Sequence, residues 1–402
     1  MITFNYKARD TSTNKITRGT VQGNTEAAAA HVLMAQGIVP IEMSPVGEGG
    51  LLSGLRSHVP SKEVVIFTRQ LSTMLSAGLP LAQSLSTVQD QTSNKTLKTI
   101  IADVVGSING GAPLSESLAK YPKVFNNVYI ALVKAGETSG TMDQSLARLA
   151  DQQEHDADQL SKIRGAMIYP AIVLVVIIAV VVFMLVTLIP QVVSMYDDLG
   201  QTLPVTTAIL MSIVDFFAKF WYIIVVVLGA LIFFTKRWLA TESGRKTWDT
   251  FKLNMPMFAT LFRKLYMARF SRTAETLLAS GVSMMETLKI SADAVNNVVV
   301  KDEILQGVGK VKNGKALSDA LTGQDYILPF VPQMIKIGES SGSIDTMLAK
   351  VADYYDKEVD AAIAGISTLI EPILMVAMAG MIGFIVLAVL LPIYQLSGTS
   401  TI

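Results

Sequence analysis

The stretches Lys134-Ala-Gly-Glu-Thr-Ser-Gly140 and Lys336-Ile-Gly-Glu-Ser-Ser-Gly342 are two versions of one motif in a chain of 402 residues. Residues on both sides of the motif also recur, 203 residues apart before it and 202 residues apart from the motif onward. The recurring pairs include Phe67 and Phe270, Arg69 and Arg272, Gly78 and Gly281, Ser115 and Ser318, Asp151 and Asp353, Asp158 and Asp360, Pro170 and Pro372, and Pro190 and Pro392. Such self-similarity indicates a duplicated structural unit. We therefore expect two copies of one domain, each followed by a similar segment between two prolines.

Both copies have the residue spacing of amphipathic helices. In the first copy Val64, Phe67, Leu71 and Met74 recur every three or four residues. A long, mostly apolar stripe follows at 142–163, and the second copy repeats it at 344–366. Turns are expected at Ala77–Pro80, Asn109–Gly111 and Ala135-Gly136. Each copy is thus predicted to be an all-helical bundle whose last helix runs towards a membrane span.

Three segments have the composition of membrane spans. Ala171–Ile189 and Ile373–Leu391 are nineteen residues each and carry no charge. A helix of that length reaches about 28 Å, close to the hydrocarbon thickness of a bilayer. The third segment, 216–235, holds Lys219, Trp221 and Tyr222, which suit a membrane interface. A buried core helix is the alternative for this third segment.

The basic residues near these segments predict their orientation. Lys162 and Arg164 precede the first span, and Lys236 and Arg237 follow the second. The connection 191–215 carries three aspartates and neither lysine nor arginine. Because cytoplasmic flanks are enriched in Lys and Arg, this connection is predicted to be periplasmic and both bundles cytoplasmic. The C-terminus is then periplasmic.

The N-terminal region differs from the repeat. Polar and apolar residues alternate at its start, a helix-like stretch covers 25–36, and a short apolar run follows at 38–41. The prediction is a mainly α integral membrane protein, with two repeated cytoplasmic helical-bundle domains, three transmembrane helices and a small N-terminal α/β module. Its boundaries are the α/β module at 1–45, a flexible linker at 46–60, the first helical domain at 61–169, a span at 170–190, a periplasmic loop at 191–215, a span at 216–235, the second helical domain at 236–371, a span at 372–392 and a periplasmic tail at 393–402.

The composition excludes several classes of function. There are 33 basic and 33 acidic residues with no block of one sign, which argues against a nucleic-acid partner. Cysteine is absent, and His31, His58 and His155 lack ligand-like spacing, so no metal site, cofactor or catalytic group is predicted. The chain is therefore not expected to be an enzyme.

One stretch, Gly309–Lys315, resembles a phosphate-binding loop. It lacks the Ser or Thr that would contact magnesium, and a helical pattern precedes it where a buried strand is required. The equivalent stretch of the first copy has Ala112 in place of the lysine. An interhelical turn is the better interpretation.

Two interpretations of the opening motif remain compatible. Thr141 with Gln144 fits a capping box, and Asp143 favours a helix N-terminus, which makes the motif a turn before a helix. Alternatively, glycine and serine expose backbone donors beside a carboxylate, as a partner-docking loop would. The candidate partner-binding residues are Gly136, Glu137, Ser139, Gly140, Gly338, Glu339, Ser341 and Gly342.

The last span holds a pair of small residues. Ala379 and Gly383 are four residues apart, a spacing that lets two helices approach closely. We take this pair as a candidate packing site between spans or between copies in a homo-oligomer.

With repeat, spans and motifs in place, the chain resembles the type II secretion F family, the inner-membrane platform proteins of secretion systems and type IV pili. The resemblance covers nearly the whole chain. It rests on Phe4-Asn-Tyr-Lys-Ala-Arg-Asp10, Gln36-Gly-Ile38, Phe67-Thr-Arg-Gln-Leu71 followed by Ala77-Gly78, both glycine-glutamate motifs and the order of the three spans. Among the subfamilies it looks most like a type IV pilus member, with the mannose-sensitive haemagglutinin pilus as the candidate subdivision.

The resemblance implies a mechanical role without chemistry. Its implied partners are a hexameric cytoplasmic assembly ATPase, pilin or pseudopilin subunits, other inner-membrane components of the machine and membrane lipid. The rival from another class is a small membrane transporter. Transporters tend to carry polar or broken helices at mid-membrane, whereas two of the three spans here have no ionisable residue.

Overall fold

The computed structural model describes residues 2–10, 16–23, 30, 33–34, 38–45, 59–198, 205–256 and 258–399. The N-terminal part contains a three-stranded antiparallel sheet of β1 (Ile2–Asp10), β2 (Ile16–Gly23) and β3 (Ile38–Pro45), in the order β2-β1-β3. The first and last strands match the alternating and apolar stretches of the sequence. The middle strand was not expected, because Ile16 and Val21 are an odd number of residues apart and therefore break the period of two.

Two other expectations for this region fall largely outside the described residues. Of the helix-like stretch 25–36, only residues 30, 33 and 34 are described, and all three are helical. Of the linker 46–60, only Val59 and Pro60 are described, and Pro60 lies directly before the first bundle helix.

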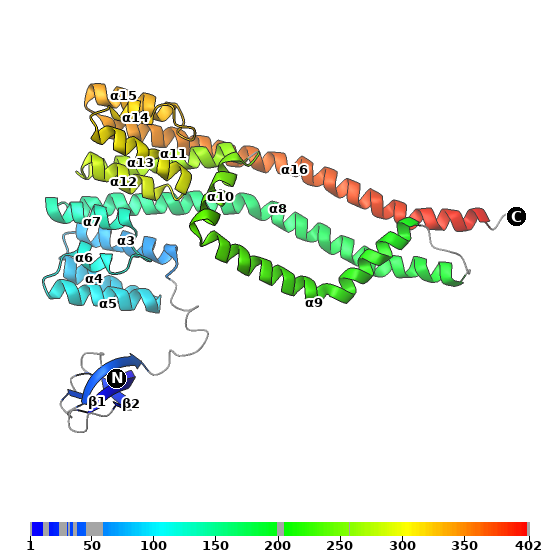
Figure 1. Ribbon diagram of the computed structural model, residues 1–402, viewed down its shortest axis with the longest axis horizontal. Coiled ribbons are helices and arrows are strands. Elements are labelled where there is room, and N and C mark those ends of the chain that lie inside the picture. Colours follow the sequence, from blue (N-terminus) through cyan, green and yellow to red (C-terminus); the bar gives the residue numbers. More distant parts are fainter. Residues whose placement is uncertain are drawn as a thin grey trace.

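The first bundle contains five helices and the start of a sixth, long helix (Figure 1). These helices are α3 (Ser61–Ser76), α4 (Leu81–Gln91), α5 (Lys95–Asn109), α6 (Leu114–Ala119), α7 (Asn127–Ser139) and α8 (Met142–Asp198). The second bundle repeats them as α11 (Ala259–Ala279), α12 (Met284–Ala294), α13 (Val298–Lys312), α14 (Leu317–Leu321), α15 (Phe330–Ser341) and α16 (Ile344–Thr399). The fold thus confirms the duplication.

Equivalent helices begin on equivalent signals. The side chain of Asn94 accepts a hydrogen bond from the Leu97 amide at the start of α5. Asn297, at the same place in the repeat, accepts from the Val299 and Val300 amides at the start of α13. An asparagine N-cap satisfies amides that have no partner inside the helix, which is why both helices start at the same repeat position.

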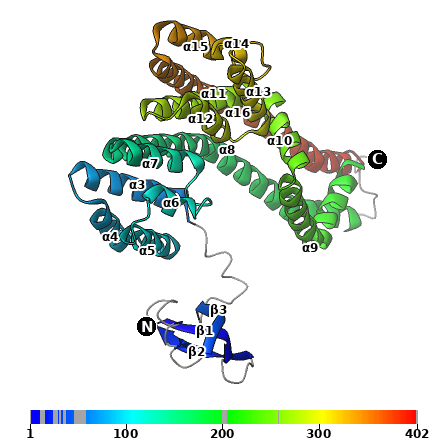
Figure 2. The same ribbon diagram turned by 60° about the vertical axis from the view of Figure 1, so that its left-hand side comes forward.

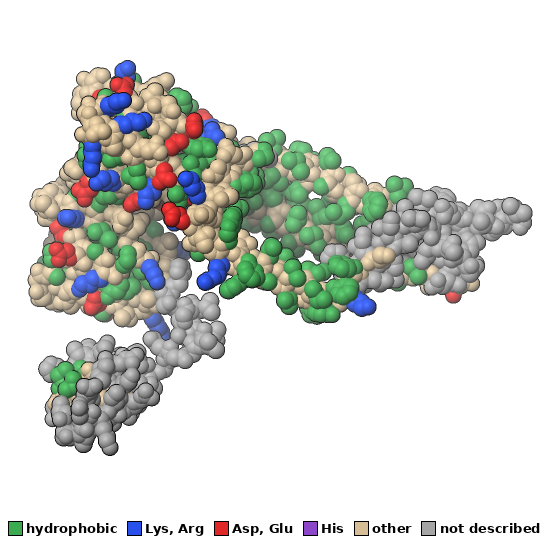
Figure 3. All heavy atoms as spheres, in the orientation of Figure 1, with side chains coloured by type: hydrophobic (Ala, Val, Ile, Leu, Met, Phe, Trp, Pro, Cys, Tyr) green, Lys and Arg blue, Asp and Glu red, His purple; other side chains and the backbone are tan. Residues whose placement is uncertain are grey.

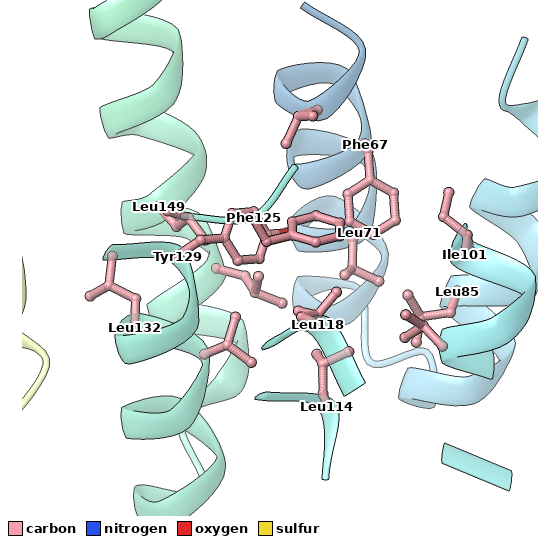
Figure 4. Close-up of a cluster of buried hydrophobic side chains, with 14 of the residues drawn as sticks. Phe67, Leu71, Leu85, Ile101, Leu114, Leu118, Phe125, Tyr129, Leu132 and Leu149 are labelled. Atoms are coloured by element: carbon pink, nitrogen blue, oxygen red, sulfur yellow. The ribbon is translucent and has the colours of Figure 1, made fainter. Parts of the chain in front are cut away.

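Each bundle has its own apolar core. In the first, Phe67, Phe125 and Tyr129 form the aromatic centre shown in Figure 4, with ring centroids 6.0 Å and 4.8 Å apart. The buried Tyr129 hydroxyl accepts a hydrogen bond from Thr68 at 3.3 Å, so burial of this ring leaves no polar atom unpaired. The second core contains Phe270 and aliphatic side chains from α12 to α16.

The two long helices belong to both a bundle and a membrane segment. Helix α8 has 57 residues and α16 has 56, and each runs without a break through both of its prolines. At about 1.5 Å per residue each is roughly 85 Å long. Figures 1 and 2 show both helices leaving the bundles in the same direction.

The helix boundaries correct two expectations. The connection 191–215 is much shorter than expected, because α8 continues to Asp198 and α9 (Val205–Leu239) begins at residue 205. In the segment predicted as a periplasmic tail, residues 393–399 continue α16. The turn expected at Ala135-Gly136 is also wrong, because both residues lie inside α7.

Three helices, α8, α9 and α16, are long and apolar enough to cross a membrane. Figure 3 shows hydrophobic side chains gathered over the described parts of these helices, while Lys, Arg, Asp and Glu gather on the bundles. After the isolated exposed residues Leu160 and Tyr354, the continuous exposed apolar surface starts at Met167 in α8 and at Leu369 in α16. Such a large exposed apolar surface needs a lipid or protein environment. A further helix, α10 (Glu242–Asn254), connects α9 to the second bundle.

We predict that Leu132→Ala destabilises the first bundle by about 2–5 kcal/mol, because the Leu132 side chain is fully buried and its removal leaves a cavity. The matched control is Leu160→Ala on α8, where the leucine is exposed and the expected loss is below about 0.5 kcal/mol. Chemical denaturation of the purified full chain in detergent measures both variants. Equal losses would contradict the assignment of this core.

Candidate functional site

The opening motif ends one helix and precedes the next. Gly140 and Gly342 follow α7 and α15 directly and have φ angles of 75° and 71°. This left-handed conformation favours glycine and terminates a helix. Helices α8 and α16 then begin at Met142 and Ile344, so the helix start predicted after the motif is confirmed.

The glutamate of each motif binds the N-terminus of a short helix in its own bundle. The carboxylate of Glu137 accepts hydrogen bonds from the amides of Leu114 and Ser115 and from the Ser115 hydroxyl, at the start of α6. A carboxylate at a helix N-terminus satisfies unpaired amides and interacts favourably with the helix dipole. Because the bonds are charge-assisted, each is stronger than a neutral one.

The second copy repeats this arrangement. Glu339 accepts from the Leu317 amide at 2.6 Å, from the Ser318 amide at 3.4 Å and from the Ser318 hydroxyl at 2.5 Å. Both ends of the interaction therefore recur in the sequence, Ser115 as Ser318 and Glu137 as Glu339. This shared contact explains why the serine and the glutamate are present in both copies.

The other motif residues also have identifiable structural roles. A Cβ atom on Gly136 would lie 2.8 Å from the Cβ of Ser145, and one on Gly338 would lie 2.8 Å from the Cα of Ile344. Glycine is therefore needed where the end of one helix approaches the start of the next. Ser139 and Ser341 donate to the carbonyl groups of Ala135 and Ile337, four residues earlier.

These contacts favour a structural role for the two glutamates and leave only part of each motif accessible to a partner. The carboxylates are used inside the bundle, whereas the side chains of Ser139 and Ser341 and the glycines after them are exposed. A partner-binding role for the eight motif residues stays a prediction. If it holds, the exposed serine and glycine positions are the accessible ones.

An arginine in each copy joins the first bundle helix to the long helix. Arg69 on α3 contacts Asp151 at 2.5 Å and Glu154 at 2.6 Å on α8. Arg272 on α11 contacts Asp353 at 2.6 Å and Asp356 at 2.8 Å on α16. The recurrence of the arginine and of the first aspartate is visible in the sequence, but their contact was not predicted.

Asp356 is also the centre of the contact between the two bundles. It accepts hydrogen bonds from Arg272 of its own bundle and from His155 and Gln159 of α8, at 3.1 Å and 2.5 Å for the last two. One turn further along, Lys162 of α8 contacts Asp360 of α16 at 2.7 Å. His155 therefore has a structural role, and α8 and α16 are joined side by side in parallel.

A partly open pocket of about 330 Å³ lies beside this contact. It is lined by residues of α8 and α11, namely Arg148, Asp151, Gln152, His155, Arg272, Glu275 and Thr276. Burial raises the pKa of the Glu275 carboxyl group. Gln152 donates to the Thr273 hydroxyl across the contact at 3.0 Å. In the described part of the chain, no group of three or more His, Cys, Asp and Glu side chains is arranged to hold a metal ion.

The stretch that resembles a phosphate loop is an interhelical turn, as predicted. Helix α13 includes Gly309 and ends at Lys312, and Gly314 lies in the turn before α14 with a φ angle of 86°. No strand precedes this stretch, because the residues before it form a helix.

The small residues of the last span face away from the described parts of the other helices. Ala379 and Gly383 are exposed on α16, and a Cβ atom on Gly383 would meet nothing within 4 Å. They do not mediate packing among the described helices of this chain. Their role in packing against another chain stays a prediction.

We predict that Glu137→Gln lowers the stability of the first bundle by about 1–3 kcal/mol, because an amide has no charge and only one acceptor atom for the α6 amides. The control is Glu116→Gln, the same change at an exposed position in the first turn of α6. Hydrogen exchange at the Leu114 and Ser115 amides should accelerate only in the first variant. If both variants behaved alike, general charge near α6 rather than the Glu137 contact would explain the motif.

The contact between His155 and Asp356 predicts a pH dependence. The hydrogen bond to Asp356 raises the pKa of His155, partial burial opposes this shift, and the residue lies in the bundle part of α8, before Met167. A raised pKa means that the stabilisation is complete below the ordinary pKa of about 6.5 and is lost as the pH rises through the folded-state pKa.

His155→Gln should therefore cost more stability at about pH 6 than at about pH 9, by roughly 0.5 kcal/mol because the ring is partly in solvent. Thermal unfolding of the full chain at both pH values measures the difference. Lys162→Gln serves as control, because the lysine keeps its charge over this range and its loss should not depend on pH. Equal effects of His155→Gln at both pH values would contradict the prediction.

Comparison with known proteins agrees with the duplicated architecture. The family model described as type II secretion system (T2SS), protein F, matches twice, at residues 67–190 and 270–392. The model of the type II secretion system protein F N-terminal domain matches residues 1–44. The two matches of the first model fall on the two bundles together with the helices that leave them.

Several relatives cover most or all of the chain. The type IV pilus assembly protein PilC of Thermus thermophilus is 36% identical over 408 residues, which is 100% of both proteins. PilC of Myxococcus xanthus is 36% identical over 85% of this chain and 82% of its own length. The type II secretion system protein F of Vibrio cholerae is 31% identical over 99% of both proteins. With its duplicated bundle, its three apolar helices and these matches, the chain is a membrane protein that belongs to the type II secretion system protein F family.

Proposed function

We propose that the chain is an inner-membrane platform of type IV pilus biogenesis or type II secretion. In this role it couples a cytoplasmic assembly ATPase to the insertion of pilin or pseudopilin subunits into a filament. The names of its relatives support this function, since they are assembly proteins of type IV pili and components of type II secretion systems. The pilus machine is favoured, because the PilC proteins of Thermus thermophilus and Myxococcus xanthus are 36% identical, whereas the type II secretion F proteins of Vibrio cholerae and Xanthomonas campestris are 31% and 33% identical. The mannose-sensitive haemagglutinin subdivision stays a prediction.

The continuity of α8 and α16 is the observation that carries this proposal. Leu146 and Leu149 on α8 lie in the first core, and the same uninterrupted helix continues into the apolar segment after Met167. Helix α16 does the same from Leu348 and Val351. Pro170 and Pro372 each remove one hydrogen bond of the helix without ending it, so a displacement of the bundle is carried along the helix to the apolar segment.

The proposed orientation has both bundles in the cytoplasm and the C-terminus in the periplasm. It rests on Lys162, Arg164, Lys236 and Arg237 at the bundle ends of the apolar helices and on the aspartates at their far ends. The proposed domain boundaries follow those of the sequence except for the shorter connection between α8 and α9, with α8 entering the membrane near residues 167–170 and α16 near 369–372. The bundles then present their charged surface to a cytoplasmic ATPase.

The apolar helices are proposed to meet membrane lipid and the apolar helices of pilin subunits. In the described part of α8, α9 and α16 most large apolar side chains are exposed, which leaves them accessible to both. Other inner-membrane components of the machine would share this surface. The role is mechanical and uses no catalytic group of the chain itself.

Breaking the rigid connection tests the proposal. Four glycines inserted after Gly165 in α8 should abolish filament assembly, because they interrupt the helix between bundle and span and allow each to move independently. The measurement is the number of surface filaments and the amount of sheared pilin. Four alanines at the same position are the control, since they preserve the helix and should retain most assembly.

Both variants must insert into the membrane and co-purify with the ATPase to the wild-type extent. Wild-type filament numbers with the glycine insertion would show that α8 does not transmit motion. Loss of ATPase binding in either variant would instead indicate damage to the bundles.

A further inference from the structure

The two bundles contact one another through different faces. The first bundle uses α7 and α8, whereas the second uses α11, α12 and α16. In the repeat α7 corresponds to α15, while α11 and α12 correspond to α3 and α4. A contact between unlike faces of like units is heterologous, and it leaves one complementary face unused on each unit. Here the unused faces are α15–α16 of the second bundle and α3–α4 of the first.

The unused face of the second bundle is exposed along α16. The stripe of α8 that faces the second bundle consists of Gln152, His155, Gln159 and Lys162. Its equivalents on α16 are Tyr354, Lys357, Ala361 and Ala364, and all four are exposed. The side chain of Tyr354 is 46% exposed. Because tyrosine is enriched at protein–protein interfaces, an exposed tyrosine at this position is consistent with a docking surface.

The unused face of the first bundle shows the complementary pattern. Val282 of the second bundle packs against the first core, and its equivalent, Leu79, is 37% exposed. Arg269 lies near enough to Asp156 of the first bundle to lower the pKa of that carboxyl group, against a stronger upward effect of burial. The equivalent of Arg269 is Ile66, which is 43% exposed.

Most exposed large apolar residues of the bundles lie on these two faces. In the described bundles, apart from α10 and the residues from Met167 and from Leu369 onward, they are Ile66, Leu79, Leu160, Ile337 and Tyr354. Ile66 lies on α3 and Leu79 in the turn before α4, Ile337 and Tyr354 lie on α15 and α16, and Leu160 lies on α8 outside both faces. The charges also match, since Lys357 takes the place of His155 and Glu154 takes the place of Asp356.

We propose that a second copy of this chain docks on these faces. The α15–α16 face of one chain binds the α3–α4 face of another and repeats the internal contact between the bundles. In this arrangement Lys357 lies opposite Glu154, and Tyr354 lies opposite Gln70, the equivalent of Thr273. Because the internal contact holds α8 and α16 in parallel, its repetition keeps the spans of both chains in one membrane.

The absence of cysteine from the chain makes a clean cross-linking test possible. One full-length chain carries Tyr354→Cys and a differently tagged chain carries Gln70→Cys, and both are expressed together in membranes. Mild oxidation should yield a disulfide-linked dimer that contains both tags, and either variant alone should stay monomeric. In a single chain, Gln152→Cys with Thr273→Cys is the positive control, because these side chains are hydrogen-bonded at 3.0 Å.

Charge reversal adds a second measurement. Lys357→Glu in the Tyr354→Cys chain should lower the dimer yield several-fold, because it places like charges opposite one another. Lys312→Glu, an exposed position on α13 outside the docking face, should leave the yield unchanged.

Two results would overturn the inference. One is a mixed sample without dimer although the internal control cross-links. The other is a dimer formed by Tyr354→Cys alone, which would indicate contact between like faces. This inference does not rest on the proposed function, because the disulfide reports only contact between chains. If the cells that express both cysteine variants assemble filaments but yield no cross-linked dimer, the docking surface is refuted and the platform role stays intact.

Discussion

The structure depends on the sharing of one helix between a bundle core and a membrane segment. Helix α8 contributes Leu146 and Leu149 to the first core, and its later turns expose the apolar surface that a bilayer requires. Helix α16 repeats this arrangement. Since each helix is continuous, the orientation of each bundle is set by its span. The charged contacts between α8 and α16, centred on Asp356, then set the orientation of the bundles relative to one another.

The glycine-glutamate motif recurs in both copies because its residues make contacts inside each bundle. The first glycine allows two helices to approach, the glutamate caps a third helix, and the last glycine terminates the helix in which the motif lies. All three functions are local to one bundle, which is why the motif survives in both copies. The arginine contacts with the long helices survive for a similar reason, because they join the first helix of each bundle to the helix that leaves it.

The differences between the copies are as informative as the similarities. His155 in the first bundle corresponds to Lys357 in the second, and Gln152 corresponds to Tyr354. The first member of each pair contacts the other bundle, whereas the second is exposed. The copies therefore share their cores and helix caps and differ on the faces where they meet. Such divergence is expected of a heterologous contact, in which equivalent residues have different neighbours.

The sequence by itself determined the duplication, the helical class, the apolar segments and the position of the helix start after each motif. Those features depend on periodicity, hydropathy and glycine placement, which are local properties of the chain. The turn predicted at Gly136 is wrong, because the sequence does not distinguish a glycine that close helix packing requires from a glycine in a turn. Only the tertiary structure decided that Glu137 caps α6, that Arg69 binds Asp151, and that α8 meets α16 through His155 and Asp356. These pairs are separated by 22 to more than 190 residues, and their contact depends on how whole helices pack.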